Sequence, residues 1–286
     1  MSNKVLIDIL KIGIKANKAD AVCFKLPELS TTVAVSTQNN FAAAPVILSK
    51  KNLLKSSPKY ILVNSGNANA CTGKIGMENA IKCTELLSKK LKCKKEEILL
   101  SSTGIIGRQL PIDIISRSIN SYKFNFKSNW KQAASTIMTT DKFSKHISRS
   151  FLLNKTKITI NAICKGAGMI EPNMATMLSF ISININLKKT LLIRLLKKSV
   201  DSSFNRISVD GDMSTNDTVM LISTGENKNL DFTRDSKTFT ILQNELTKVC
   251  SDLSEMIIKD GEGATKVVKI NIYKAHNIFQ AKKTAY

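Results

Sequence analysis

The chain repeats one arrangement several times: a short run of β-branched residues, a loop rich in Gly, Asn, Ser and Thr, and then an amphipathic run. In the clearest case YILVN (60–64) leads through NSGNANACTG (64–73) into MENAIKCTELLSKKLKC (77–93), and ILLSS (98–102) follows. β-Branched residues favour strands, and apolar residues three or four positions apart favour a helix. Strands and helices that mix along a chain pack in layers, so the sequence predicts a layered α/β or α+β fold.

The same signals predict further elements. We expect a hairpin at 150–163, a buried strand after Thr176, and a loop at 121–131 that docks on the core. Further strands are expected at 31–37 and 266–274, and the polar loop at the start of 209–224 is expected to run into another. Helices are expected from Pro111, from a cap at Ser128, over 190–200, from Ser236 to Gly261, and at the C-terminal end.

The charge is strongly positive, with 43 Lys plus Arg against 22 Asp plus Glu. Such a balance can indicate nucleic acid, anionic lipid or acidic substrates. The segment SYKFNFKSNWK (121–131) interleaves aromatic residues with lysines, as a stacking platform for nucleic acid would. However, the lysines are scattered, and no long basic block or nucleic-acid motif is present. We therefore interpret the charge as compositional drift and predict no nucleic-acid partner.

Other features bear on location and metal binding. No stretch reaches the roughly 18 to 20 apolar residues that span a bilayer, and the first residues lack the features of a signal peptide. The six cysteines form no C-x-x-C pair, and the two histidines are distant from them in sequence. The sequence therefore predicts no membrane association, no zinc site, no dense disulfide framework and a cytoplasmic protein.

Several familiar catalytic and binding motifs are missing. His146 and His276 lie in no recognisable catalytic motif, and neither G-x-S-x-G nor a glycine-rich phosphate loop is present. The segment VDGDMSTND (209–217) is similar to a calcium loop, but Thr215 and Leu221 replace the glycine and glutamate that an EF-hand needs. Any nucleophile must therefore be activated without a histidine motif.

The segment KGAGMIEPNMATMLSF (165–180) offers such a nucleophile in Thr176. If the chain cuts its own Ala175–Thr176 bond through an N→O acyl shift, Thr176 becomes an N-terminus. Its α-amine, with an ordinary pKa of about 7.7 to 8.0, can then take the proton of the hydroxyl. The alternative is a threonine that simply begins a β-strand, where threonine is common. The segment alone leaves both interpretations open.

Four further groups could complete such a site. Thr103 and Gly104 in STGIIG (102–107) could direct hydrogen-bond donors at a developing oxyanion, or could form an ordinary strand-to-helix turn. Glu262 in DGEGATK (260–266) could bind a cationic amine, or could be a solvated turn residue. Lys165 could bind a carboxylate as a point charge. IMTTD (137–141) offers the hydroxyls of Thr139 and Thr140.

Six segments together resemble one family, the bifunctional ornithine acetyltransferase / glutamate N-acetyltransferase of arginine biosynthesis. The similarity extends from about Ile12 to Tyr286. The segments, in chain order, are NSGNANACTG, STGIIG, IMTTD, KGAGMIEPNMATML, VDGDMSTNDT and DGEGATK.

This resemblance implies a fold and an assembly. The fold would be a layered α/β sandwich like that of self-cleaving N-terminal-nucleophile-type aminopeptidases. The precursor would cut itself between Ala175 and Thr176 into an α chain (1–175) and a β chain (176–286), usually assembled as α2β2. Members of the family continue for roughly a hundred residues more. We therefore expect the β chain to be incomplete and to lack an Asn and a Ser or Thr of the substrate site.

The resemblance also implies an activity. Thr176 would take acetyl from N-acetylornithine and pass it to glutamate in a ping-pong reaction, with no cofactor and no metal. Some members also accept acetyl-CoA, so it stays open as a co-substrate. Thr103 and Gly104 match the oxyanion-hole positions of the family. Lys165, Thr176 and Glu262 match substrate-binding positions, as does one threonine of IMTTD, for which we favour Thr140 over Thr139.

Three alternatives remain. A related self-cleaving aminopeptidase or amidase with an N-terminal threonine or serine would share the cleavage but release amino acids. An inactive truncated homologue would share the fold alone. A non-enzymatic basic binding protein would bind nucleic acid in a strongly salt-dependent manner and would not cut itself.

Overall fold

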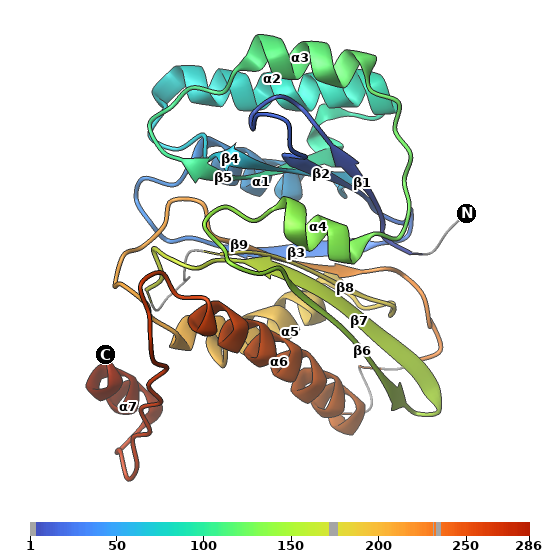
Figure 1. Ribbon diagram of the computed structural model, residues 1–286. Coiled ribbons are helices and arrows are strands. Elements are labelled where there is room, and N and C mark those ends of the chain that lie inside the picture. The colour runs from blue at the N-terminus through green and yellow to red at the C-terminus, as the bar shows by residue number, and fades with distance from the viewer. Residues whose placement is uncertain (1–3, 172–176, 231, 233–235) are drawn as a thin grey trace.

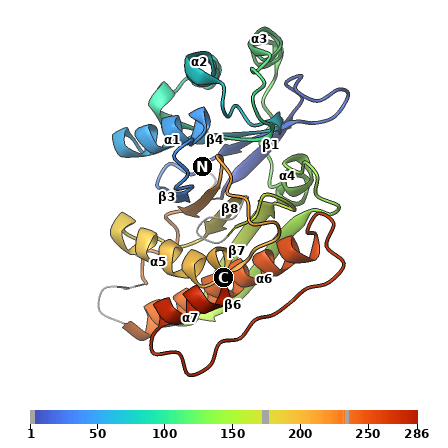
Figure 2. The same ribbon diagram turned by 90° about the vertical axis from the view of Figure 1, so that its left-hand side faces the viewer.

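Two β-sheets lie face to face, and helices cover their outer faces, which gives four layers (Figures 1 and 2). The structure is a computed structural model that describes residues 4–171, 177–230, 232 and 236–286. The layered α/β prediction is therefore confirmed. The proposed cleavage site, Ala175 and Thr176, lies outside the described residues.

The first sheet has four strands, and helices α2 (Gly73–Leu91) and α3 (Ile112–Ser121) cover its outer face (Figure 1). Alternate residues of a strand point to opposite faces, so Cys23 packs in the cluster beneath these helices while Phe24 packs in the cluster between the sheets. Helix α1 (Ala44–Lys55) packs against β5 and α2. The strand order is β1 (Leu6–Leu10), β2 (Ala21–Lys25), β4 (Tyr60–Asn67) and β5 (Ile98–Ile105).

The second sheet has five strands, and helices α5 (Lys189–Asp201) and α6 (Ser236–Lys259) cover its outer face. Neighbouring strands are antiparallel except for β8 and β9, which run parallel. The strand order is β3 (Thr31–Ser36), β9 (Thr218–Ser223), β8 (Leu178–Ile183), β7 (Thr156–Lys165) and β6 (Lys145–Leu153). Because β7 and β8 lie on opposite sides of the predicted cleavage point, the predicted α and β chains share this sheet.

The two sheets are joined by a buried aromatic cluster. The ring of Phe24 on β2 stacks on Phe180 of β8 at a centroid distance of 5.1 Å and contacts Trp130 at 5.7 Å. Trp130 begins the short helix α4 (Trp130–Thr136), which lies between the sheets (Figure 1). Burial of large aromatic side chains contributes strongly to core stability, so this cluster fixes the spacing of the two sheets.

Most predicted elements are confirmed, including the 150–163 hairpin and the helices over 77–93 and 190–200. Two details are wrong. The alternating segment 266–274 pairs with no strand of the described chain and is largely solvent-exposed. Helix α4 begins after Asn129 rather than after Ser128, and Asn129 makes no side-chain cap hydrogen bond.

Three short elements complete the described chain: η1 (Lys95–Glu97), η2 (Phe204–Arg206) and α7 (Ile278–Ala285). Helix α7 lies outside the four layers (Figure 1), and its Tyr286 hydroxyl donates to the carbonyl of Asn205 at 2.8 Å. None of the helices in the described ranges combines the length and the apolarity that a membrane crossing requires.

Candidate active site

A cavity of about 610 Å³ lies where strand ends and loops of both sheets meet. Its wall includes every described residue that the sequence singles out for binding or catalysis, and those residues are Thr103, Gly104, Thr139, Thr140, Lys165 and Glu262. Thr176 is outside the described residues, but the next residue, Met177, also lines the cavity. The structure therefore brings together groups that are up to 159 positions apart in the chain, from Thr103 to Glu262.

Thr103 and Gly104 lie within β5, which extends to Ile105, rather than in a turn after the strand. Gly104 faces Gly66 of the parallel strand β4 and has a φ of +130°, a conformation that side chains other than glycine rarely adopt. A Cβ atom on Gly104 would lie 2.3 Å from the backbone carbon of Gly66. Only glycine lets the two strands approach this closely at the cavity wall.

Lys165 ends β7 and is almost fully buried. Its Nζ donates a hydrogen bond to Thr103 Oγ1 at 3.1 Å. Burial lowers the pKa of the Lys165 ammonium, and the nearby carboxylates of Asp141 and Asp217 partly oppose this effect. Because Thr103 Oγ1 accepts from Lys165, the hydroxyl hydrogen of Thr103 stays available for a group in the cavity.

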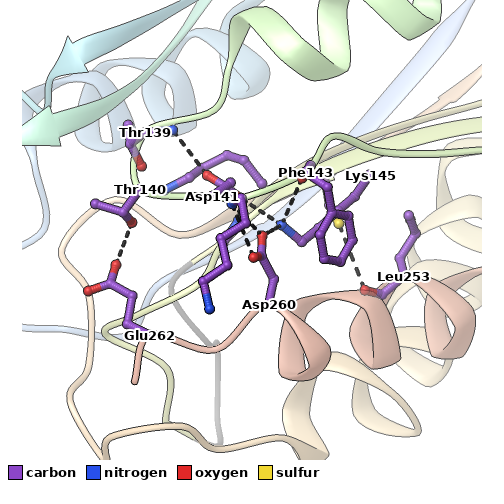
Figure 3. A network of polar contacts seen from close by, with 12 residues as sticks. Thr139, Thr140, Asp141, Phe143, Lys145, Leu253, Asp260 and Glu262 are labelled. Carbon is purple, nitrogen blue, oxygen red and sulfur yellow. Dashed lines mark hydrogen bonds and ion pairs between the residues drawn. The ribbon is translucent and has the colours of Figure 1, made fainter. Parts of the chain in front are cut away.

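Thr140 and Glu262 touch across the cavity wall. The Thr140 hydroxyl donates to Glu262 Oε1 (Figure 3). The turn that carries Glu262 is held by a hydrogen bond from its own backbone N–H to Ala167 O at 2.7 Å. Gly168 gives the carboxylate room, since a Cβ there would lie 2.8 Å from the Glu262 Cδ. Thr139 also lines the cavity, and its backbone N–H donates to the Asp141 carboxylate.

A buried ion network lies next to these residues (Figure 3). The side chains of Lys145, Asp141 and Asp260 are completely buried. Lys145 Nζ lies 2.7 Å from Asp141 Oδ1 and 2.5 Å from Asp260 Oδ2. Buried charges are tolerated when they are paired and hydrogen-bonded, and here each carboxylate also accepts backbone N–H groups.

This network joins the three segments that carry the candidate binding residues. Asp141 accepts from the N–H of Thr139 at 3.0 Å and of Gly166 at 2.8 Å, which fixes the loop before Lys145 against the end of β7. Asp260, just after α6, accepts from the N–H of Lys142 at 3.1 Å. The positions of Thr140, Lys165 and Glu262 are therefore set by one set of buried charges.

The comparisons with known proteins agree with this arrangement. Residues 6–286 match the ArgJ family. The chain belongs to the ArgJ family.

Its curated relatives include three from distant organisms. It is 42% identical over 294 residues to arginine biosynthesis bifunctional protein ArgJ 1 of Clostridium acetobutylicum, a match that covers 100% of this chain and 72% of the relative. It is 40% identical to the Pseudomonas fluorescens protein (93% of this chain, 66% of the relative) and 42% identical to the mitochondrial protein of Dictyostelium discoideum (90% and 59%). The chain therefore spans about two thirds of the length of these relatives.

Solved structures are also similar. An ArgJ crystal structure from Bacillus halodurans matches with a TM-score of 0.53 and 28% identity, covering 60% of this chain and 91% of that one. An L-aminopeptidase D-Ala-esterase/amidase from Ochrobactrum anthropi, described as a variant of the Ntn hydrolase fold, matches at 0.52 with 9% identity, covering 90% and 84%. The second likeness concerns the fold alone, and it is the fold that the resemblance to N-terminal-nucleophile-type aminopeptidases implied.

In this ArgJ chain, the loop before β9 supplies two groups that the sequence did not reveal. Asn216 Nδ2 donates to Ala68 O at 2.7 Å and to Ser102 O at 2.8 Å, which ties the loop to the first sheet. Asp217 is buried, and its Oδ1 accepts from Met177 N at 3.0 Å, while its Oδ2 has no hydrogen-bond partner among the residues that the structure describes. Burial raises the pKa of the Asp217 carboxyl well above its ordinary value. Both residues lie in VDGDMSTNDT, so the motif indicated the segment but not these roles.

Lys145, Asp260 and Lys15 were also missed. Lys145 and Asp260 are ordinary charged residues in sequence, and no spacing connects positions 115 residues apart. Lys15 lines the cavity but lies outside the six segments that carry the resemblance. No signal in a single sequence marks these three residues.

Proposed function

We propose that the chain cuts itself between Ala175 and Thr176 and then transfers acetyl from N2-acetyl-L-ornithine to L-glutamate through an acetyl ester on Thr176. One observation carries the proposal: the described residues predicted for this chemistry line a single cavity, and Met177, bonded to Thr176 in sequence, lines it too. The family membership and the names of its relatives, bifunctional proteins of arginine biosynthesis, support the same reaction.

In the first half-reaction the Thr176 hydroxyl attacks the acetyl carbonyl, and the free α-amine of the same residue takes the hydroxyl proton. The oxyanion receives hydrogen bonds from the Thr103 hydroxyl, which Lys165 leaves free to donate, and from the backbone at Gly104. The C–N bond then breaks, the proton moves from the α-amine to the departing nitrogen, and ornithine leaves.

In the second half-reaction the neutral α-amine of glutamate attacks the carbonyl of the acetyl ester and gives up a proton to the α-amine of Thr176. That proton passes to the Thr176 oxygen as the ester C–O bond breaks, and N-acetylglutamate leaves. Lys165 would bind a carboxylate of the substrate, and Glu262 would bind a cationic amine, with Thr140 holding the Glu262 carboxylate in place. The acetyl group is carried by Thr176 itself, so the proposed reaction needs no cofactor and no metal. Acetyl-CoA presents the same acetyl carbonyl, so an acetylation assay with acetyl-CoA in place of N-acetylornithine tests it as a second donor.

The test begins with the purified chain on a denaturing gel. We expect two fragments, 1–175 and 176–286, and a Thr176→Ala chain that stays whole. Thr190→Ala, which changes an exposed threonine in the first turn of α5, is the matched control and should be cut normally. Mass spectrometry should then find acetyl on Thr176 after incubation with N-acetylornithine, and N-acetylglutamate once glutamate is added. A Thr176→Ala chain that is still cut at this bond would refute the proposal.

The second candidate is a self-cleaving aminopeptidase or amidase, which the fold shared with the Ochrobactrum protein favours. It predicts the same two fragments but release of amino acids from peptides, with no acetyl passed to glutamate. For the acetyltransferase we further propose an α2β2 assembly in the cytoplasm. Light scattering of the purified chain tests the assembly, and cell fractionation tests the location.

A further inference from the structure

Lys15 lies between β1 and β2, and its side chain reaches the wall of the same cavity. Its Nζ donates to Ser65 Oγ at 2.7 Å and to Met138 O at 2.8 Å. Ser65 Oγ in turn donates to Thr136 O at 2.7 Å. The ammonium is therefore held in a defined position, between β4 of the first sheet and the loop that carries Thr140.

The positive charge of Lys15 has no partner among the described residues. No carboxylate of the described chain lies within 4.0 Å of its Nζ. The acid nearest in sequence, Asp20, is fully buried and accepts backbone N–H groups from Ile12 at 2.7 Å, Ile14 at 2.6 Å and Lys15 itself at 3.0 Å. Asp20 thus shapes the loop rather than pairing with the ammonium.

An unpaired cation at the edge of a cavity is costly unless an anion joins it. An ammonium has three hydrogens, and the contacts to Ser65 and Met138 use two of them. Burial lowers the pKa of Lys15, and the neighbouring Lys18 and Lys165 lower it further, while Asp20 and Asp141 oppose this. An anionic ligand in the cavity would pair with the Lys15 ammonium and would also raise its lowered pKa.

We infer that Lys15 binds a carboxylate of the amino-acid acceptor in this cavity, as a second cation beside Lys165. The identity of the acceptor rests on the proposed function. Glutamate carries two carboxylates, and the cavity wall offers two ammonium groups, Lys15 and Lys165, for them. The third cationic residue of the wall, Arg108, is exposed. N-Acetylornithine carries one carboxylate and one ammonium, which suits Lys165 and Glu262. Lys15 therefore distinguishes the acceptor from the donor.

The test compares Lys15→Met, Lys15→Arg and the control Lys18→Met, which removes an exposed lysine three positions away. Calorimetry measures the Kd of each full chain for glutamate and for N-acetylornithine, and kinetics follow the two half-reactions separately. Loss of a hydrogen bond to a charged group weakens binding by about 10- to 100-fold. We expect this factor in the Kd and KM for glutamate of Lys15→Met, and a change below about threefold in acetyl-Thr176 formation. Lys15→Arg should keep most of the affinity, and Lys18→Met all of it.

The outcomes separate three possibilities. If Lys15 only ties the loop to Ser65 and Met138, Lys15→Met lowers the melting temperature and weakens the binding of glutamate and of N-acetylornithine by the same factor. This result overturns the inference. Unchanged glutamate binding in Lys15→Met also overturns it, even if the acetyl transfer is intact. A chain that binds glutamate through Lys15 but transfers no acetyl supports the inference and refutes the proposed function. A wild-type chain that binds neither ligand overturns both.

Discussion

Replacing Lys145 with Met tests the buried ion network directly. Met is close to Lys in length and volume and carries no charge, so Lys145→Met leaves the packing nearly intact and removes only the cation. Asp141 and Asp260 then remain completely buried without the ammonium that lies 2.7 and 2.5 Å from them. Removing one partner of a buried pair costs about 3–5 kcal/mol, because an uncompensated charge stays in the interior. Domains have only about 5–15 kcal/mol of stability, so this loss is large.

The loss of unfolding free energy in Lys145→Met should also depend on pH. Burial alone would raise the pKa of the Asp141 carboxyl. The positive charges of Lys165 and Lys145, and hydrogen bonds from Lys145 Nζ and Thr139 N, hold that pKa below its ordinary value. A carboxyl with a lowered folded pKa stabilises the protein above its unfolded pKa of about 3.9, and this stability is lost as the pH falls through the folded value. In Lys145→Met a main cause of the lowering is gone, so protonation costs less in the folded state. The difference between wild type and variant should therefore shrink from pH 7 toward pH 4.

Urea unfolding, followed by the fluorescence of Trp130, measures this difference. Trp130 is the only tryptophan of the chain and packs on Phe24 in the core. The double variant Lys145→Met with Asp260→Asn removes one of the two stranded charges and should recover part of the loss. Lys259→Met breaks an exposed pair with Glu255 and should have no measurable effect. A loss of unfolding free energy below about 1 kcal/mol in Lys145→Met, or a loss that does not change with pH, would refute the reasoning.

Three further predictions follow from single positions. Gly104→Ala places a Cβ against Gly66, so we expect a loss of about 1–3 kcal/mol in urea unfolding and a strong loss of acetyl transfer. In a native-state thiol titration the exposed Cys71 should react quickly. Cys250, whose burial raises its pKa to about 12, should react only in denaturant. Burial and Lys131 lower the pKa of His146, so stability should fall as the pH drops from 6.5 through that folded value, and urea titrations of His146→Gln should lack this decline.

The fold was largely predictable because most elements carry local signals. YILVN and ILLSS are buried strands whose β-branched and apolar residues face both a helical layer and the other sheet. The segment 266–274 shows where such signals fail. It has the alternation of a strand, but Val268 is 78% exposed and Ile270 is 60% exposed, and neither sheet of the described ranges includes this segment. Alternation predicts a strand only where tertiary structure supplies a partner.

The candidate site was predictable as a set of motifs but not as a geometry. Thr103 and Lys165 are 62 positions apart, and Thr140 and Glu262 are 122 apart, yet each pair makes a hydrogen bond. Nothing local to these segments shows that they meet. Only the resemblance to a family connected these segments. It predicted the binding residues but not the buried charges of Lys145 and Asp260 that lie next to them.

The buried ion network of Lys145, Asp141 and Asp260 is not explained by a contribution to the stability of the fold. A well-packed apolar replacement for a buried ion network is often as stable as the network or more so, so burial of Lys145 and its carboxylates is weak evidence of a stabilising role. The hydrogen bonds point to a different reason. Asp141 accepts from Thr139 N and Gly166 N, and an apolar side chain could pack in its place but could not hold those two backbone groups. The network therefore orders the loops that present Thr140 and Lys165. Its role is to fix the geometry of the cavity rather than to add stability to the fold.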